Sequence, residues 1–413
     1  MNNILNYFKI AWKSLGQQKS RTILTIIALS IGIALLIIMF AAGEGLKGMV
    51  LSELDIYNPN TISIEIKVPS KGNASSATSM AGGNNITTFK NKDIEAIAKL
   101  ENIKSYFPYV TGQEIFKYKN ANQAGIIFGY GFAAADMQKL ETTIGRFYTK
   151  EEEESLASVV VLGSKIKENL FGDQEAIGEN VYVRGIPFRV VGVLKEQGGG
   201  FMDMDSISYI PTKTMQKKLL GTDYVIGVLV EVIDEKKINN TKDDIEFLMD
   251  ERHNITDPEK RDFQAMTMAE AKEMVNTVLN AITLLLVALT FISLIVGGVG
   301  ITNIMYVSVI ERTFEIGLRR AVGAKKNDVR YQFLAEAIIL TFFGGVFGII
   351  IGAGVALVIY FLALAIGLNW TFNVSIFSII LALVFSSCLG FVFGVFPAQK
   401  AAELDPITAL RKD

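Results

Sequence analysis

Few residues of this 413-residue chain belong to the types that most often carry chemistry. The sequence has one histidine, His253, and one cysteine, Cys388. A single histidine lacks the co-ligands that a metal ion needs, and a single cysteine cannot form a disulfide within the chain. We expect His253, which lies in a charged run, to be a solvated surface residue. The sequence therefore predicts neither a metal site nor catalytic residues.

Motifs for nucleotide hydrolysis, nucleophilic catalysis and dinucleotide binding are also absent from the sequence. It contains no G-x-x-x-x-G-K-[ST] phosphate loop, no nucleophile elbow and no zinc-binding H-E-x-x-H. The net charge of −2 provides no basic surface for nucleic acid. We therefore expect a chain that is not itself an enzyme and binds neither a cofactor nor nucleic acid.

The most informative spacing of charged and apolar residues lies in GGVGITNIMYVSVIERTFEIGLRRAVGAKK, residues 297–326. An uncharged helix here continues directly into a short amphipathic segment, 311–324, with Gly323 as a helix stop. Two roles fit it: a helix seated in a partner's groove, or a membrane-surface anchor whose basic residues only set topology. Its candidate contact residues are Glu311, Arg312, Phe314, Glu315, Ile316, Leu318, Arg319, Arg320 and Gly323.

The elements around this segment are membrane spans. Hydrophobic residues make up 50% of the chain and the mean hydropathy is +0.35. Four segments are long enough to cross a hydrocarbon core of about 30 Å. They comprise residues 22–43, 277–310, 331–366 and 374–397. Because the spans show no embedded ionisable residue, they offer no evident ion path, and energy must come from elsewhere.

Lysine and arginine residues cluster before the first span and in the segment that follows the second span. By the positive-inside rule, both chain termini and the segment 311–330 are cytosolic. Residues 1–21 then form an amphipathic helix on the cytosolic membrane surface, and residues 398–413 form a cytosolic tail, in which Asp405 caps a short helix.

In the third span, Gly344, Gly348 and Gly352 recur every four residues. This spacing allows close packing against another helix, although it also arises by chance in glycine-rich helices.

Residues 44–276 have dispersed charges and form one large extracytoplasmic domain. Alternating strand patterns, such as 61–68 and a hairpin about Gly185, mix with helical patterns at 91–100 and 236–250. The small polar stretch 69–88 indicates a mobile loop. The fold class is therefore an integral membrane protein with four transmembrane α-helices and a large α+β domain inserted between the first and second.

Four stretches resemble one family, the ABC transporter permeases of the MacB/FtsX, or mechanotransmission, type. They are residues 12–33, the domain core 144–194, the helix and segment 301–329, and the C-terminal FPAQKAAELDPITALR at 396–411. The resemblance implies a permease subunit that couples ATP hydrolysis to movement of its extracytoplasmic domain and exports or extracts an antibiotic, peptide or lipid-linked molecule. The alternative is an FtsX-like regulator of a cell-wall hydrolase, whose extracytoplasmic domain is smaller.

The resemblance also implies partners. ATP would bind to a separate ABC ATPase subunit, because this sequence begins almost at its first span. A second permease copy and a membrane-fusion adaptor complete the expected assembly in the bacterial inner membrane. Residues 311–324 would then be the coupling helix that seats on the ATPase.

Overall fold

The computed structural model describes residues 19–54, 58–69, 86–196, 203–368 and 370–410. It divides into a helical unit, residues 1–48, 277–365 and 370–413, and a sheet unit, residues 49–276 and 366–369. Nearly all of the expected N-terminal surface helix and most of the polar stretch 69–88 lie outside the described residues.

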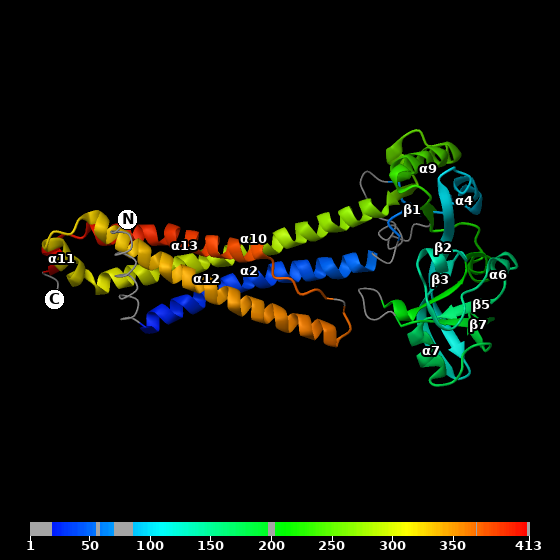
Figure 1. The fold of residues 1–413 in the computed structure, drawn as a ribbon, viewed down its shortest axis with the longest axis horizontal. Helices are drawn as coiled ribbons and strands as arrows, with labels where there is room; N and C mark the ends of the chain where they lie inside the picture. Colours follow the sequence, from blue (N-terminus) through cyan, green and yellow to red (C-terminus); the bar gives the residue numbers. More distant parts are fainter. Residues whose placement is uncertain (1–18, 55–57, 70–85, 197–202, 369, 411–413) are drawn as a thin grey trace. The chain divides into compact units, whose positions relative to one another are not determined.

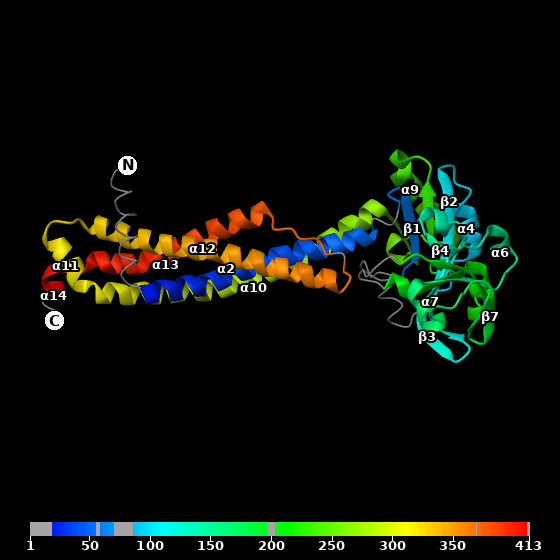
Figure 2. The same cartoon turned by 60° about the horizontal axis from the view of Figure 1, so that its bottom comes forward.

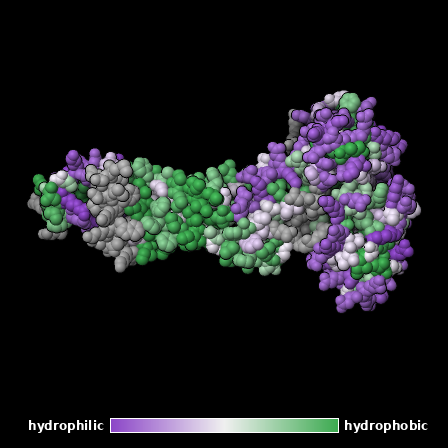
Figure 3. All heavy atoms as spheres, viewed as in Figure 1, coloured by the Kyte–Doolittle hydropathy of each residue, from purple (hydrophilic) through white to green (hydrophobic). Residues whose placement is uncertain are grey.

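Four long helices build the helical unit and run side by side (Figure 1). They are α2 (Lys19–Leu54), α10 (Met268–Glu311), α12 (Lys326–Ala365) and α13 (Ile376–Glu403). The short helix α11 (Thr313–Ala321) connects α10 to α12, and the short helix α14 (Pro406–Leu410) follows α13. Each long helix is apolar enough to cross a membrane. Hydrophobic side chains cover the middle of the bundle (Figure 3), which is the surface expected of helices that face lipid.

The helices extend beyond the expected spans. The first continues from residue 43 to Leu54, and the fourth continues through Pro397 to Glu403. Proline lacks an N–H group, so the carbonyl of Phe393, four residues earlier, loses its helical donor. The Thr302 hydroxyl of α10 donates a hydrogen bond of 3.0 Å to that carbonyl instead. The neighbouring helix thus satisfies the freed group, and α13 passes the proline.

The glycine stripe of α12 faces α2. A Cβ atom at Gly344 would lie 2.5 Å from Leu29 Cδ2. At Gly348 it would lie 2.6 Å from Ile33 Cβ, and at Gly352 2.8 Å from the carbonyl oxygen of Ala34. Only glycine permits this backbone approach, so the three residues form a close seam between the two helices.

The sheet unit contains one ten-stranded mixed sheet with short helices packed on it (Figure 2). The strand order is β10-β1-β9-β2-β3-β8-β5-β7-β4, and β6 pairs with β2 and β7. The strands are β1 (Thr61–Ile66), β2 (Ile103–Tyr118), β3 (Ala121–Tyr130), β4 (Thr142–Gly145), β5 (Val159–Leu162), β6 (Asn180–Val183), β7 (Ile186–Leu194), β8 (Ile207–Pro211), β9 (Gly227–Val232) and β10 (Phe263–Thr267). The helices are α4 (Asn91–Ile97), α5 (Ala134–Met137), α6 (Lys150–Glu154), α7 (Ser164–Phe171), α8 (Thr212–Thr214) and α9 (Ile238–His253).

The expected α+β class is confirmed, with the hairpin where the sequence indicated it. Strands β6 and β7 meet at Arg184 and Gly185, whose φ angles are +50° and +80°. Two positive φ angles define the tight turn that matches strand twist. Strand β2 runs through Pro108 without a break. Its first half pairs with β9 and its second half with β3.

Candidate coupling site

Helix α11 (Thr313–Ala321) is a separate short helix between α10 and α12, at the end of the bundle where α13 also ends (Figure 1). Helix α10 ends at Glu311, Arg312 follows with a φ angle of −101°, and the Thr313 hydroxyl donates to the Ile310 carbonyl at 2.7 Å. Gly323 closes the segment with a φ angle of +104°, where glycine is favoured. Within 311–324, the sequence thus forms the helix Thr313–Ala321 with a defined stop.

Three arginines fasten this helix to the rest of the bundle. The Arg312 guanidinium donates to both carboxylate oxygens of Glu336 in α12, at 3.0 and 3.3 Å. Arg319 donates to Gln332 Oε1, also in α12, at 2.7 Å, and Arg320 donates to the Ala402 carbonyl of α13 at 3.0 Å. Because two different helices supply the acceptors, α11 is held against tilting in two directions.

The inner face of α11 is packed as well as hydrogen-bonded. Ile316 is 4% exposed and belongs to the bundle core together with Val329 and Phe333. A Cβ atom at Gly317 would lie 2.6 Å from Ala409 Cβ, so α14 rests directly on α11. Packing within this chain therefore already covers Ile316, so this predicted contact residue is not accessible to a partner.

The C-terminal helix that rests there has the expected cap. The Thr408 N–H group donates to Asp405 Oδ2 at 3.3 Å, and Pro406 occupies the first turn of α14. The sequence-based prediction of capping by Asp405 is confirmed.

The outer face of α11 presents an apolar strip to solvent. Phe314, Leu318 and Val322 are spaced four residues apart and are 57%, 49% and 81% exposed. Glu315 pairs with Arg319 at 2.6 Å beside this strip, and Glu311 is exposed at the end of α10. We call Phe314, Leu318 and Val322 the α11 strip.

Sequence reasoning missed the residue that anchors this site. Glu336 lies inside the expected third span, and its side chain is only 3% exposed. The expectation that the spans hold no embedded ionisable residue is therefore wrong at this end. A buried carboxylate is stable only with a charged, hydrogen-bonded partner, and Arg312 is that partner. The signal in the sequence was a single glutamate just inside an apolar helix that follows an arginine-rich segment.

The expectation for His253 is also wrong. Its side chain is 8% exposed, and Nδ1 lies 2.8 Å from Asp262 Oδ1 while Nε2 lies 3.5 Å from Asp93 Oδ2. Arg252 pairs with Asp93 at 2.7 Å in the same cluster. The hydrogen bond with Asp262 raises the pKa of His253 against the opposing effect of burial. The histidine joins the end of α9 to β10 and α4, and it is structural.

Stability of the sheet unit should fall as the pH rises above about 6.5, the ordinary pKa of histidine. A group whose pKa is higher in the folded than in the unfolded state stabilises the fold fully at pH values below its unfolded-state pKa. This stabilisation is lost as the pH rises through the folded-state pKa. Pulse proteolysis of the full-length protein in urea, between pH 6 and 9, measures the stability of the sheet unit as a function of pH. The variant His253→Gln should show a flatter pH profile. An unchanged slope in that variant would assign the effect to other groups.

Four long apolar helices with an α+β domain inserted between the first and second define a multi-pass membrane protein. Comparison with known families places it further. Residues 22–248 match the family described as MacB-like periplasmic core domain, and residues 287–406 match that described as FtsX-like permease C-terminal. The chain belongs to the MacB/FtsX-type ABC transporter permeases.

Individual proteins show the same similarity. The macrolide export ATP-binding/permease protein MacB of Bdellovibrio bacteriovorus is 33% identical, over 100% of this chain and 62% of that protein. The pyoverdine export ATP-binding/permease protein PvdT of Pseudomonas syringae is 30% identical, over 99% and 60%. The periplasmic region of MacB from Actinobacillus actinomycetemcomitans has a TM-score of 0.46 at 22% identity, covering 55% of this chain and 97% of that structure. The chain thus spans about 60% of the length of these two full-length relatives.

Proposed function

We propose that this chain is the permease subunit of an ATP-driven exporter in the bacterial inner membrane, and that α11 receives the movement of a separate ABC ATPase subunit. The observation that carries this proposal is the two-sided construction of α11. Its inner face is tied by Arg312, Arg319 and Arg320 to other helices, whereas the α11 strip is exposed on the other side. A force applied to the strip therefore reaches the whole bundle.

The composition of the α11 strip suits a protein partner. Apolar anchors that fill a groove supply most of the affinity at interfaces, and flanking charges set orientation. Glu315 and Arg319 are the flanking charges here. The same end of the helical unit carries Lys325, Lys326 and Arg330 in the sequence, which supports a cytosolic position. Both termini would then be cytosolic and the sheet unit extracytoplasmic.

The wider assembly follows from the family. We expect a homodimer of this permease that works with two ATPase subunits and a membrane-fusion adaptor. ATP is bound by the ATPase, since this sequence holds no phosphate loop. The relatives are named for a macrolide and for pyoverdine, so an antibiotic, peptide or lipid-linked molecule is the substrate class.

The exporter reading is favoured over a regulator of a cell-wall hydrolase. The match to the MacB-like periplasmic core domain covers residues 22–248, which include most of the sheet unit. Export proteins of the MacB and PvdT kinds align along the whole chain. These observations support handling of a substrate by the sheet unit.

Replacing Phe314 with aspartate should abolish stable binding of the ATPase while leaving the fold intact. A charge in the centre of an apolar contact removes an anchor and must be desolvated, at a cost of about 2 kcal/mol or more. The measurement is co-purification with the ATPase in detergent, scored as complex mass and ATP turnover. Phe247→Asp is the matched control, because Phe247 is 72% exposed on α9. Equal ATPase binding by both variants would contradict the proposal.

Glu315→Lys tests orientation rather than affinity. The exposed pair Glu315–Arg319 contributes at most about 1 kcal/mol to folding, so the helix should persist. We expect ATP hydrolysis without the accompanying change in hydrogen exchange of the sheet unit. Glu154→Lys disrupts a comparably exposed i,i+4 pair with Lys150 and is the control. Coupling that survives Glu315→Lys would remove this residue from the docking surface.

A further inference from the structure

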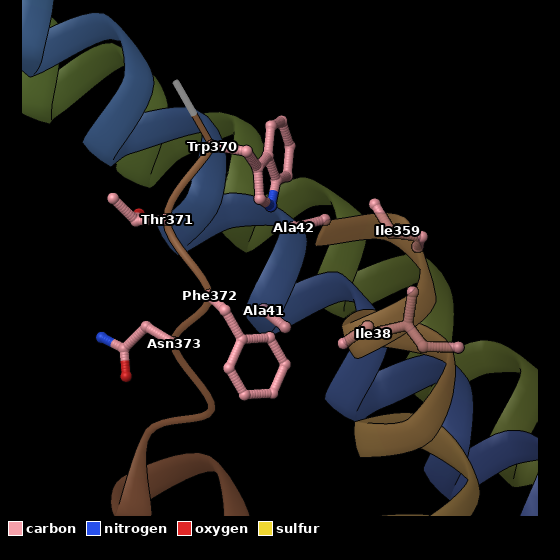
Figure 4. A pocket seen from close by; sticks show the side chains of 9 residues that line it. Ile38, Ala41, Ala42, Ile359, Trp370, Thr371, Phe372 and Asn373 are labelled. Atoms are coloured by element: carbon pink, nitrogen blue, oxygen red, sulfur yellow. The ribbon is translucent and has the colours of Figure 1, made fainter. Parts of the chain in front are cut away.

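Residues 370–373, in the connection between α12 and α13, lie against α2 (Figure 4). This part of the helical unit lies at the end opposite α11 (Figure 1). A Cβ atom at Gly45 of α2 would lie 2.2 Å from Trp370 Cε2 and 2.3 Å from its Nε1. One turn further along α2, a Cβ atom at Gly48 would lie 2.3 Å from Thr371 Oγ1. The indole and the threonine therefore rest directly on the helix backbone.

Glycine at these two positions has a physical reason. Glycine inside a helix costs about 1 kcal/mol relative to alanine, so a helix gains nothing locally from Gly45 and Gly48. A Cβ atom at either position would overlap the side chain of Trp370 or Thr371 as it stands, so glycine permits their close approach. The contact therefore depends both on the glycines of α2 and on the side chains of Trp370 and Thr371.

The same connection also touches α12. The ring of Phe372 lies 5.9 Å from the ring of Tyr360, centroid to centroid. Phe372 also lines a small cavity with Ile38 and Ala41 of α2 (Figure 4). Since the glycine seam joins α12 to α2 from Leu29 onward, α2 is held by the hairpin along its length up to Gly48.

We propose that Trp370 and Thr371 form a clasp that fastens α2 to the α12–α13 hairpin, so that the three helices move as one body throughout the transport cycle. This rests on the proposed function, in which α11 receives the movement of the ATPase. Arg312 and Arg319 pass that movement to α12, and the clasp passes it to α2. Helix α2 then continues to Leu54 and leads into the sheet unit at β1. Trp370 and Thr371 are positioning residues.

The first test replaces Gly45 with alanine in the full-length chain bound to its ATPase. We expect the ATP-driven change in hydrogen exchange of the sheet unit to fall about tenfold, while ATP turnover remains. Trp370 emission, recorded in a Trp12→Phe background because the chain has two tryptophans, should shift to longer wavelength. Gly354→Ala is the control, since a Cβ atom there would meet no described atom within 4 Å.

The double variant Gly45→Ala with Trp370→Ala tests whether the two residues act through their mutual contact. Trp370→Ala should make the Gly45→Ala substitution harmless, because the clash is then gone, and the double variant should equal Trp370→Ala alone. Full coupling in Gly45→Ala, or additive losses in the double variant, would overturn the clasp.

The second test asks whether the clasp opens during the cycle. The Gly48 Cβ position is 3.2 Å from Thr371 Cβ, close to the separation of about 3.8 Å in a disulfide. Gly48→Cys with Thr371→Cys, in a Cys388→Ser background, should cross-link and keep ATP-driven movement. If oxidation abolished the ATP-driven movement of the sheet unit and dithiothreitol restored it, the proposal that α2, α12 and α13 move as one body would be overturned. Absence of ATP-driven movement in the unmodified protein would instead overturn the proposed function. In that case the cross-link and the shift in Trp370 emission would still test whether the clasp forms.

Discussion

Replacing Arg312 with alanine is expected to lower the free energy of unfolding of the protein by about 3 kcal/mol and to stop transmission from α11. The Arg312 and Glu336 side chains are 10% and 3% exposed, so the substitution leaves a buried carboxylate without its cation. Removing one partner of a buried pair costs about 3–5 kcal/mol, more than the pair itself contributes. Pulse proteolysis in detergent measures the stability, and the ATP-driven change in hydrogen exchange of the sheet unit measures the coupling.

The control for this prediction is the double variant Arg312→Met with Glu336→Met. Two apolar side chains of similar length fill the same space and leave no charge unpaired. We expect this double variant to regain most of the stability while coupling stays low. The hydrogen-bonded ion pair that fixes the orientation of α11 has then become an apolar contact, which does not fix an orientation. If the single and double variants were equally unstable, packing at this site would matter and the ion pair would not.

Gly348→Val is expected to separate α12 from α2. A Cβ atom at Gly348 would lie 2.6 Å from Ile33 Cβ and 2.8 Å from the Ser30 carbonyl oxygen, and valine adds two further methyl groups. Overpacking of this kind costs about 1–3 kcal/mol where neighbours can adjust, and backbone on one side leaves little room to adjust. The loss should appear as lower thermal stability in detergent and as a lost cross-link between cysteines on the two helices.

Gly354→Val is the matched control for the seam. It lies on the same helix, six residues later, and a Cβ atom there would have no described atom within 4 Å. Both variants carry the same propensity change from glycine to valine, so only packing distinguishes them. Equal stability of the two variants would show that α2 and α12 do not depend on the seam.

Much of this architecture was readable from periodicity. The apolar lengths predicted four long helices, and the four-residue spacing of Gly344, Gly348 and Gly352 predicted a close helix contact without naming its partner. The amphipathic pattern at 311–324 predicted a short helix with Gly323 at its end. These features are local, because each is specified by residues within one or two turns of one another.

The features that the sequence did not reveal depend on distant pairs. Arg320 bonds a carbonyl 82 residues away, and His253 is buried because Asp93, 160 positions earlier, lies beside it. Backbone carbonyls such as that of Ala402 carry no sequence signal at all.

The hydrogen bond at Pro397 has a consequence for biosynthesis. The last turns of α13 leave the Phe393 carbonyl without a donor until the Thr302 hydroxyl arrives from α10. An unsatisfied carbonyl in hydrocarbon costs several kcal/mol, so α13 is complete only beside α10. During synthesis α10 leaves the ribosome first and is already in place when Phe393 emerges. A permuted gene that encodes α13 ahead of α10 would reverse this order. The fourth helix would then wait in the membrane with the Phe393 carbonyl unsatisfied, exposed to quality-control proteases.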